Sequence, residues 1–226
     1  MTRPGIAWAY SELSKYVQYP GASHMDAANH VLRYLRGTHD KSICYSRDTR
    51  DNIDRNTLWG WVDADWAGDT ATRRSHTGYV LMLNGGAISW KSRRQDNVSL
   101  STSEAEYVAA SQCGQDVLYL REMLSDFAVP QSAPTAIYED NMACIAMSEN
   151  PVRRKYSRHI DIRRYFVREL VHAGVLKLIP LRTSKMVADA LTKSLPFPAF
   201  SKYCAVMFGD TPFVSFPAHS LRVCGG

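Results

Sequence analysis

The stretch that most constrains the fold of this chain is WGWVDADWAGD, residues 59–69. Trp59, Trp61 and Val62 are typical of a strand that is buried in a sheet. The strand pattern ends in Asp63, and Asp65 follows two residues later. An uncompensated carboxylate is costly to bury. The fold must therefore place something beside the end of this strand that compensates the acid.

The pattern after residue 59 predicts strands first and alternating strands and helices later. TGYVLMLNGGAISWKS, residues 77–92, is typical of a hairpin with Asn84-Gly85-Gly86 at its turn. A short strand is expected at 97–101, and then a long helix that starts near Ser101 behind two capping boxes. Further strands are predicted at 135–140 and 175–181, and helices at 141–150, 157–174 and 184–195. This order predicts an α/β fold with a mixed sheet and helices packed on it.

Three sections follow from the pattern. Residues 1–50 read as two helices, which are too short to form a stable domain alone and resemble the end of something larger. The polar segment 46–57 is expected to be a linker, and residues 55–197 form the main domain. Residues 198–226 contain several Pro and Gly without a sustained period, and we expect a C-terminal tail.

Composition excludes several classes of protein. No apolar run is long enough for a membrane helix, and no signal peptide is apparent, so an intracellular location is expected. The five cysteines show no CxxC pair, which argues against a disulfide framework and against a zinc site. The net charge is +5, and the basic residues occur in clusters at 73–74, 91–94, 153–155 and 158–168. These clusters favour a nucleic acid as the partner.

Four acids occupy comparable places in the predicted fold. Asp63 and Asp140 each end a strand, Glu104 opens the long helix, and Asp189 lies in the first turns of the last predicted helix. Each has an ordinary alternative reading: Glu104 as a capping residue, Asp189 as a first-turn acid, and Asp140 as a turn residue. Carboxylates that gather without His or Cys partners select Mg²⁺, or Mn²⁺, rather than zinc.

Longer motifs identify a family. VDADWAGD, RRSHTGYV, ISWKSRRQDNVSLSTSEAEY, EDN, RRKYSRHIDIRRYFVRE and MVADALTKSLP resemble the ribonuclease H domain of copia-type retrotransposon reverse transcriptases. RPGIAWAYSELSKY and HVLRYLRGT resemble the segment that connects the polymerase to that domain. The similarity covers residues 3 to about 200. It implies a ribonuclease H-like mixed five-stranded sheet flanked by helices, with a short N-terminal helical segment.

The resemblance also implies an activity. The family cleaves the RNA strand of RNA–DNA hybrids with two Mg²⁺ ions, for which Mn²⁺ is the substitute. Its acids fall on Asp63, Glu104, Asp140 and Asp189, with Asp63 bridging both ions, Glu104 and Asp140 completing one, and Asp189 completing the other. The neighbouring acids Glu106 and Glu139 are expected to point elsewhere, and Asp65 is the most credible substitute because it shares a strand face with Asp63.

The implied partners are the hybrid and the polymerase domain of a parent polyprotein, in the cytoplasm, the nucleus or a virus-like particle. The candidate contacts to the nucleic-acid backbone are Arg73, Arg74, Lys91, Arg93 and Arg94. Trp90 is expected either to pack against a sugar or to belong to the core. One departure from many enzymes of this fold is that LRTSKMVAD, before the last acid, has no histidine; His159 and His172 lie on the preceding predicted helix.

Other functions remain in view. Polymerase activity is excluded for this chain because it requires adjacent aspartates and a palm upstream of residue 59. A catalytically inactive retrotransposon-derived fragment that binds nucleic acid or a polymerase partner is the main alternative. A transposase-like or integrase-like nuclease of related fold is a third reading, although such enzymes use fewer acids and lack the SEAEY-type helix start.

Overall fold

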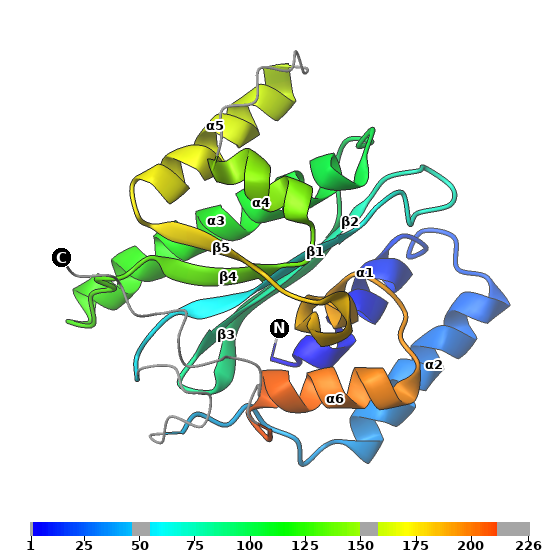
Figure 1. The fold of residues 1–226 in the computed structure, drawn as a ribbon. Coiled ribbons are helices and arrows are strands. Elements are labelled where there is room, and N and C mark those ends of the chain that lie inside the picture. The colour runs from blue at the N-terminus through cyan, green and yellow to red at the C-terminus, as the bar shows by residue number, and fades with distance from the viewer. Residues whose placement is uncertain (1, 47–54, 150–157, 212–226) are drawn as a thin grey trace.

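A computed structural model describes residues 2–46, 55–149 and 158–211 of the chain. Within these residues a five-stranded sheet carries helices on both faces (Figure 1). The strands are β1 (Trp59–Asp65), β2 (His76–Leu83), β3 (Gly86–Arg94), β4 (Thr135–Glu139) and β5 (Leu176–Pro180), in the spatial order β3-β2-β1-β4-β5. β1, β2 and β3 are antiparallel neighbours, whereas β4 runs parallel to both β1 and β5. The predicted mixed five-stranded sheet with flanking helices is confirmed.

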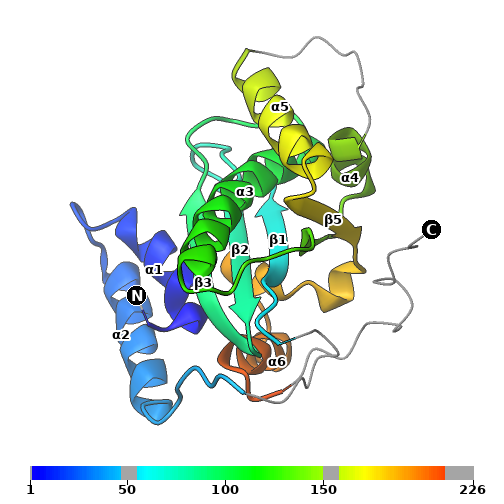
Figure 2. The ribbon, with the colours of Figure 1, turned by 90° about the vertical axis from the view of Figure 1, so that its left-hand side faces the viewer.

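One face of the sheet is covered by α3 (Thr102–Asp126), with α4 (Met142–Glu149) and α5 (Arg158–His172) beside it. Figure 2 shows α3 lying across the middle of the sheet. Val62, Tyr79 and Ile137 form one buried cluster with Tyr107 and other apolar residues of α3. Burying these large side chains is the main stabilising contribution on this face.

The opposite face holds the aromatic side chains that alternate along β1. Trp59 and Trp61 pack with Tyr138 of β4 and with Met186 and Leu191, which lie in or next to short 3-10 turns after β5. The elements on this face are α1 (Ala7–Ser14), α2 (Ala22–Gly37), η2 (Thr183–Lys185), η3 (Val187–Leu191) and α6 (Phe197–Phe208). Asp63 continues the row of Trp59 and Trp61, so the acid at the strand end points toward the η3 side of the sheet.

The predicted helix at 184–195 is wrong, because this stretch forms the two 3-10 turns η2 and η3. The backbone N–H of Asp189 bonds to the carbonyl of Met186, and that of Thr192 bonds to the carbonyl of Asp189. Such i→i+3 bonds tighten the chain, and the Thr192 side chain also contacts the carbonyl of Asp189. The tight turns keep Asp189 and Thr192 on one side of the segment, because residues three apart share a face, and both side chains are buried.

The structure also corrects the expected C-terminal tail from residue 198. Residues 197–208 form α6, which buries Tyr203, Met207 and Phe208 against the sheet. The boundary signals are present in the sequence: Pro198 lies in the first turn and Gly209 ends the helix with φ 78°. Residues 212–226 lie outside the described residues.

Residues 97–101 do not form the predicted strand. Here Ser99 Oγ donates to Gln95 Oε1, and Gln95 Nε2 donates to the carbonyl of Ala105, so side chains hold the segment against α3. These local bonds replace the pairing that a strand would require. The hairpin is confirmed, with Asn84 (φ 51°) and Gly85 (φ 83°) in the left-handed turn that joins β2 and β3.

The two N-terminal helices are confirmed as α1 and α2, and α1 packs directly on β3. Of the predicted linker 46–57, residues 47–54 lie outside the described residues, as do the basic residues 153–155. Among the helices that the structure describes, none is long and apolar enough to cross a membrane.

Candidate metal centre

Three carboxylates meet at the ends of β1 and β4. Asp63, Glu106 and Asp140 each bring an oxygen within 4.8 Å of the other two. Asp63 belongs to β1 and Asp140 follows β4 directly, and these strands are parallel neighbours. Glu106 lies near the start of α3, which packs on β1. The convergence arises because the carboxyl ends of parallel strands share one edge of a sheet.

Glu104, the glutamate expected in this group, is placed elsewhere. Its carboxylate accepts a hydrogen bond of 3.0 Å from the backbone N–H of Leu100, while its own N–H donates to Ser101 Oγ at 3.2 Å. Ser101 caps the start of α3 and the Glu104 carboxylate reaches back to the residue before the cap, so the ordinary reading of Glu104 as a capping residue describes the structure. The expectation that Glu106 points elsewhere is corrected, because Glu106 is 5% exposed and faces Asp63 and Asp140.

A signal for this choice is present in the sequence. TSEAEY contains two glutamates two residues apart, which a helix separates by about 200°. Only one of them can close the cap while the other faces the sheet. The helix is capped by Ser101, to which Glu104 donates its N–H, and this leaves Glu106 on the buried side of α3.

Burial makes this group electrostatically unfavourable without a cation. Burial raises the pKa of Asp63 to about 7, in opposition to the nearby Lys193 ammonium, which lowers it. Burial, followed by the carboxylates of Glu139 and Asp63, raises the pKa of Glu106 well above its usual range. Among the described residues, Glu106 Oε2 is buried without a hydrogen-bond partner. An all-oxygen donor set with an unpartnered buried oxygen fits a hard divalent cation.

Glu139 is a further buried acid next to the group of Asp63, Glu106 and Asp140. It is the last residue of β4, it is fully buried, and one of its carboxylate oxygens accepts the backbone N–H of Asn141 at 3.0 Å. Burial raises its pKa to about 8. Its second oxygen has no hydrogen-bond partner among the described residues. Glu139 is therefore a second acid for which the fold offers incomplete compensation.

Asp189, in η3, lies next to Asp63 but does not belong to the group of three carboxylates. The Thr192 hydroxyl, three residues later, donates to Asp63 Oδ2 and ties this segment to the strand end. Gly78 on β2 lies opposite Asp63, and a Cβ there would come within 2.6 Å of Thr192 Cγ2 and 2.9 Å of Leu191 Cβ. Only a glycine lets the segment approach this closely, so Gly78 helps to position Asp189.

Cations and hydroxyls surround the acids on this side. Lys193 Nζ lies 2.8 Å from Asp189 Oδ1. Thr183 Oγ1, in η2, donates to Asp140 Oδ2 at 2.7 Å. Asp65 does not belong to the group of three carboxylates. It stands near Lys193 and Asp189, and its pKa is raised by burial. The site thus has two sides. On one side the carboxylates of Asp63, Glu106 and Asp140 meet, and on the other side the Lys193 ammonium pairs with Asp189.

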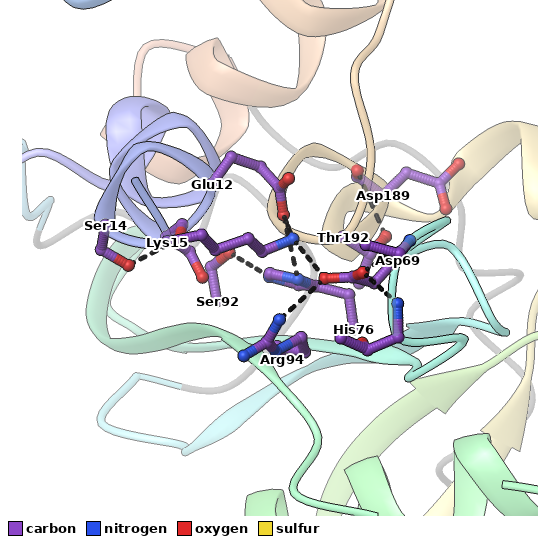
Figure 3. A network of polar contacts seen from close by, with 12 residues as sticks. Glu12, Ser14, Lys15, Asp69, His76, Ser92, Arg94, Asp189 and Thr192 are labelled. Carbon is purple, nitrogen blue, oxygen red and sulfur yellow. Dashed lines mark hydrogen bonds and ion pairs between the residues drawn. The ribbon is translucent and has the colours of Figure 1, made fainter. Parts of the chain in front are cut away.

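A second cluster of charges lies at the end of β1 and is drawn in Figure 3. Asp69 Oδ2 is 2.9 Å from Lys15 Nζ and 3.0 Å from Arg94 Nη1, and Lys15 Nζ is also 2.6 Å from Glu12 Oε1. His76 Nε2 lies 2.8 Å from Ser92 Oγ in the same region. Because Glu12 and Lys15 come from the end of α1, this salt-bridge network attaches the N-terminal helices to β2 and β3.

Arg94, one of the candidate nucleic-acid contacts, belongs to this network, because its guanidinium pairs with Asp69. Arg73 is exposed and Arg74 is half-buried. Lys91 lies over the Tyr79 ring, and Arg93 is exposed and paired with Asp96 at 3.2 Å. Trp90 is partly buried against the cluster of Trp59 and Trp61. Of the two roles expected for Trp90, packing in the core is therefore the one that the structure supports.

A polar groove connects two of these basic residues to α5. Lys91, Arg93 and Arg163 line it together with Asn97, Ser111, Gln112, Gln115 and Ile162, and its volume is about 380 Å³. Sequence reasoning noted Arg163 only as part of a basic run. The groove shows that it shares one surface with β3 and α3. Of the two histidines on α5, His172 is exposed at its end, and the side chain of His159 lies outside the described residues.

Comparison with known proteins finds that the chain is similar to parts of mobile-element polyproteins. It is 40% identical over 195 residues to the retrovirus-related Pol polyprotein from transposon TNT 1-94 of Nicotiana tabacum, covering 86% of this chain. It is 34% identical over 202 residues to the corresponding polyprotein from transposon RE2 of Arabidopsis thaliana, covering 89% of this chain. The chain spans 14% of the length of each of these relatives.

A solved structure of LC11-RNase H1, isolated from compost, aligns with 65% of this chain and 97% of its own, with a TM-score of 0.47 and 15% identity. No family model matches the sequence. The identities to the two plant polyproteins extend over most of the chain. The chain is therefore a homologue of the retrovirus-related Pol polyproteins of plant retrotransposons.

Proposed function

We propose that this chain is the ribonuclease H domain, with its connecting segment, of a copia-type Pol polyprotein, and that it hydrolyses the RNA strand of RNA–DNA hybrids. The observation that carries the proposal is the meeting of Asp63, Glu106 and Asp140 within 4.8 Å at the ends of two parallel strands. Homology to Pol polyproteins of retrotransposons supports it. A hybrid is the substrate expected in reverse transcription, and the polymerase domain of the polyprotein is the expected partner.

The residues present fit two divalent ions, Mg²⁺ with Mn²⁺ as the substitute. Asp63, Glu106 and Asp140 would hold one, and Asp63 with Asp189 would hold the other. When bound, such ions activate a water molecule and stabilise the departing oxygen of a phosphodiester. The chain's own part is orientation: Thr192 fixes Asp63, Thr183 fixes Asp140, and Gly78 lets Asp189 approach.

The candidate hybrid contacts lie on two surfaces. Arg73 and Arg74 are in the turn between β1 and β2, and Lys91, Arg93 and Arg163 line the groove between β3, α3 and α5. These cations would contact backbone phosphates without reading sequence. Arg94 would act indirectly, through the salt-bridge network that holds the turn by Asp69. Discrimination of RNA from DNA would use the 2′-hydroxyl.

The test is digestion of a hybrid whose RNA strand is labelled. With Mg²⁺ the protein should release RNA fragments, while chelation of the metal and the Asp140→Asn variant should both abolish the products. Lys177→Gln is a matched surface control, because Lys177 is exposed on β5 at the far end of the strand pair, opposite Ala136. Intact RNA at saturating protein, with retained hybrid binding, would establish the inactive nucleic-acid-binding fragment instead.

A further inference from the structure

Lys193 stands where the site would receive a second cation. It lies just beyond η3, and its Nζ is 2.8 Å from Asp189 Oδ1. The adjacent Thr192 donates to Asp63 Oδ2. One short segment thus supplies an ammonium and a hydroxyl to the two carboxylates on this side. Asp189 Oδ1 and, on the other side, Glu106 Oε2 are both buried without a hydrogen bond among the described residues, but only Asp189 Oδ1 has the Lys193 ammonium beside it.

The positive charge of Lys193 interacts with more carboxylates than that of Asp189 alone. Burial lowers the pKa of Lys193, but Asp63, Asp189 and Asp65 raise it, and the net result is a raised pKa. The side chain of Lys193 is 36% exposed, whereas that of Asp189 is 9% exposed. A flexible lysine that is partly open to water can therefore leave the site, while the acid that it covers stays in place.

We propose that Lys193 is a built-in counter-cation for the Asp63–Asp189 side of the site, and that a divalent ion binding between these carboxylates displaces its ammonium. This inference rests on the proposed two-ion function. The two ions then bind unequally: the first enters the group of Asp63, Glu106 and Asp140, and the second competes with Lys193. Lys193 is a positioning residue that holds the acids together between turnovers.

Calorimetric titration of Mn²⁺ into the whole chain tests this directly, with wild type compared with Lys193→Gln. The weaker of two ions should bind at least about tenfold more tightly in the variant, because a positive charge next to its site is gone. The affinity for the stronger ion should change less than that for the weaker ion, because Lys193 pairs directly with Asp189 and, in the group of three, interacts only with Asp63. Lys177→Gln removes the same charge from the exposed face of β5 and should titrate like wild type.

A second measurement uses the unmodified protein and does not depend on how the variant folds. Acylation of lysines, followed by mass spectrometry, should show Lys193 reacting faster at saturating Mg²⁺ than in chelator, with Lys177 unchanged. An unchanged second-ion affinity in Lys193→Gln, or an unchanged reactivity of Lys193, would overturn the inference while leaving metal binding intact. If the wild-type chain binds no divalent ion, the proposed function fails along with it.

Discussion

Asp63 and Asp69 lie six residues apart and show opposite electrostatic outcomes. The side chains of both are buried. Burial raises the pKa of Asp63 to about 7, and neighbouring Asp189 and Asp140 raise it further against Lys193. Burial also raises the pKa of Asp69, but Lys15, the amide of Thr72 and Arg94 lower it more, so the net pKa lies well below its usual range.

The difference separates an acid whose charge the fold compensates from one whose charge it does not. Around Asp69 the chain supplies its own cations, from α1 and β3, and the charges stabilise the fold without any ligand. Around Asp63 it supplies further acids and one partly exposed lysine. Perturbed carboxylates that the fold leaves uncompensated are characteristic of functional sites. Under the proposed function the acid group takes up an ion from solution, whereas the salt-bridge network needs none.

The largest expected effect comes from Asp63→Asn. Hybrid cleavage should fall roughly a thousandfold, because the loss of a shared ligand removes several kcal/mol of metal-based stabilisation. The free energy of unfolding of the metal-free protein at pH 8 should stay constant or rise, since one buried like charge disappears. Gel-based cleavage assays and urea unfolding in chelator measure the two quantities. If Asp63→Asn lowered the free energy of unfolding as much as Asp69→Asn does, the distinction between these two acids would not hold.

Asp69→Asn should show the reverse pattern. It should lower the free energy of unfolding by about 3 kcal/mol, because Lys15 and Arg94 then lose a buried partner; a fully buried pair costs 3–5 kcal/mol, and Arg94 is a third exposed. The affinity for Mn²⁺ should remain within about twofold of wild type. Urea unfolding with parallel metal titration tests this, and a variant with normal stability but weakened metal binding would be the contrary finding.

A pH profile of stability sharpens the comparison. The folded-state pKa values of Asp63, about 7, and Glu139, about 8, lie above their unfolded values, so the folded state binds more protons and stability falls as pH rises. Between pH 6.5 and 8.5 the metal-free protein should lose roughly 2 kcal/mol.

Two groups of the salt-bridge network do not interfere in this window. Burial lowers the pKa of His76 to about 4, so its contribution changes only between about pH 4 and 6.5, and Asp69 titrates lower still. Saturating Mg²⁺ should flatten the slope, because ions replace protons on the acids. Unfolding curves with and without Mg²⁺ give the profile, and a metal-free protein that gains stability toward pH 8.5 would refute the assignment.

The smallest effect belongs to Glu104→Gln. Gln can still accept the N–H of Leu100, so the cap of α3 should lose less than about 1 kcal/mol. Cleavage should stay within about twofold of wild type, because Glu104 points away from the other acids. Steady-state cleavage beside thermal unfolding measures both. A variant that folds normally but does not cut would restore Glu104 to the site.

Much of this arrangement could be read from the sequence. The run from Trp59 to Asp63, the Asn84-Gly85 turn and the amphipathic helices predicted the sheet and its flanking helices, because alternation and turn chemistry are local signals. Asp63 and Asp140 could be placed near each other because strand ends are visible in the pattern, whereas the helix on which Asp189 was predicted does not form. These signals do not depend on how distant segments pack.

The remaining errors have physical causes that are not local. The choice between Glu104 and Glu106 depends on which serine caps α3 and on the rotation of α3 against β1. η3 is a tight turn rather than a helix because Thr192 and Asp189 are drawn to the strand end, opposite Gly78. The ion pair between Asp69 and Lys15 joins residues far apart in the sequence, and no periodic pattern of residues predicts it.

The most direct test of the central claim is calorimetric titration of Mn²⁺ into wild type, Glu106→Gln and Glu104→Gln. The group of Asp63, Glu106 and Asp140 predicts that the tighter ion is lost, or weakened by at least about tenfold, only in Glu106→Gln. Glu104→Gln should match wild type. Loss of the ion in Glu104→Gln with normal binding in Glu106→Gln, or no divalent binding by the wild-type chain, would contradict the account.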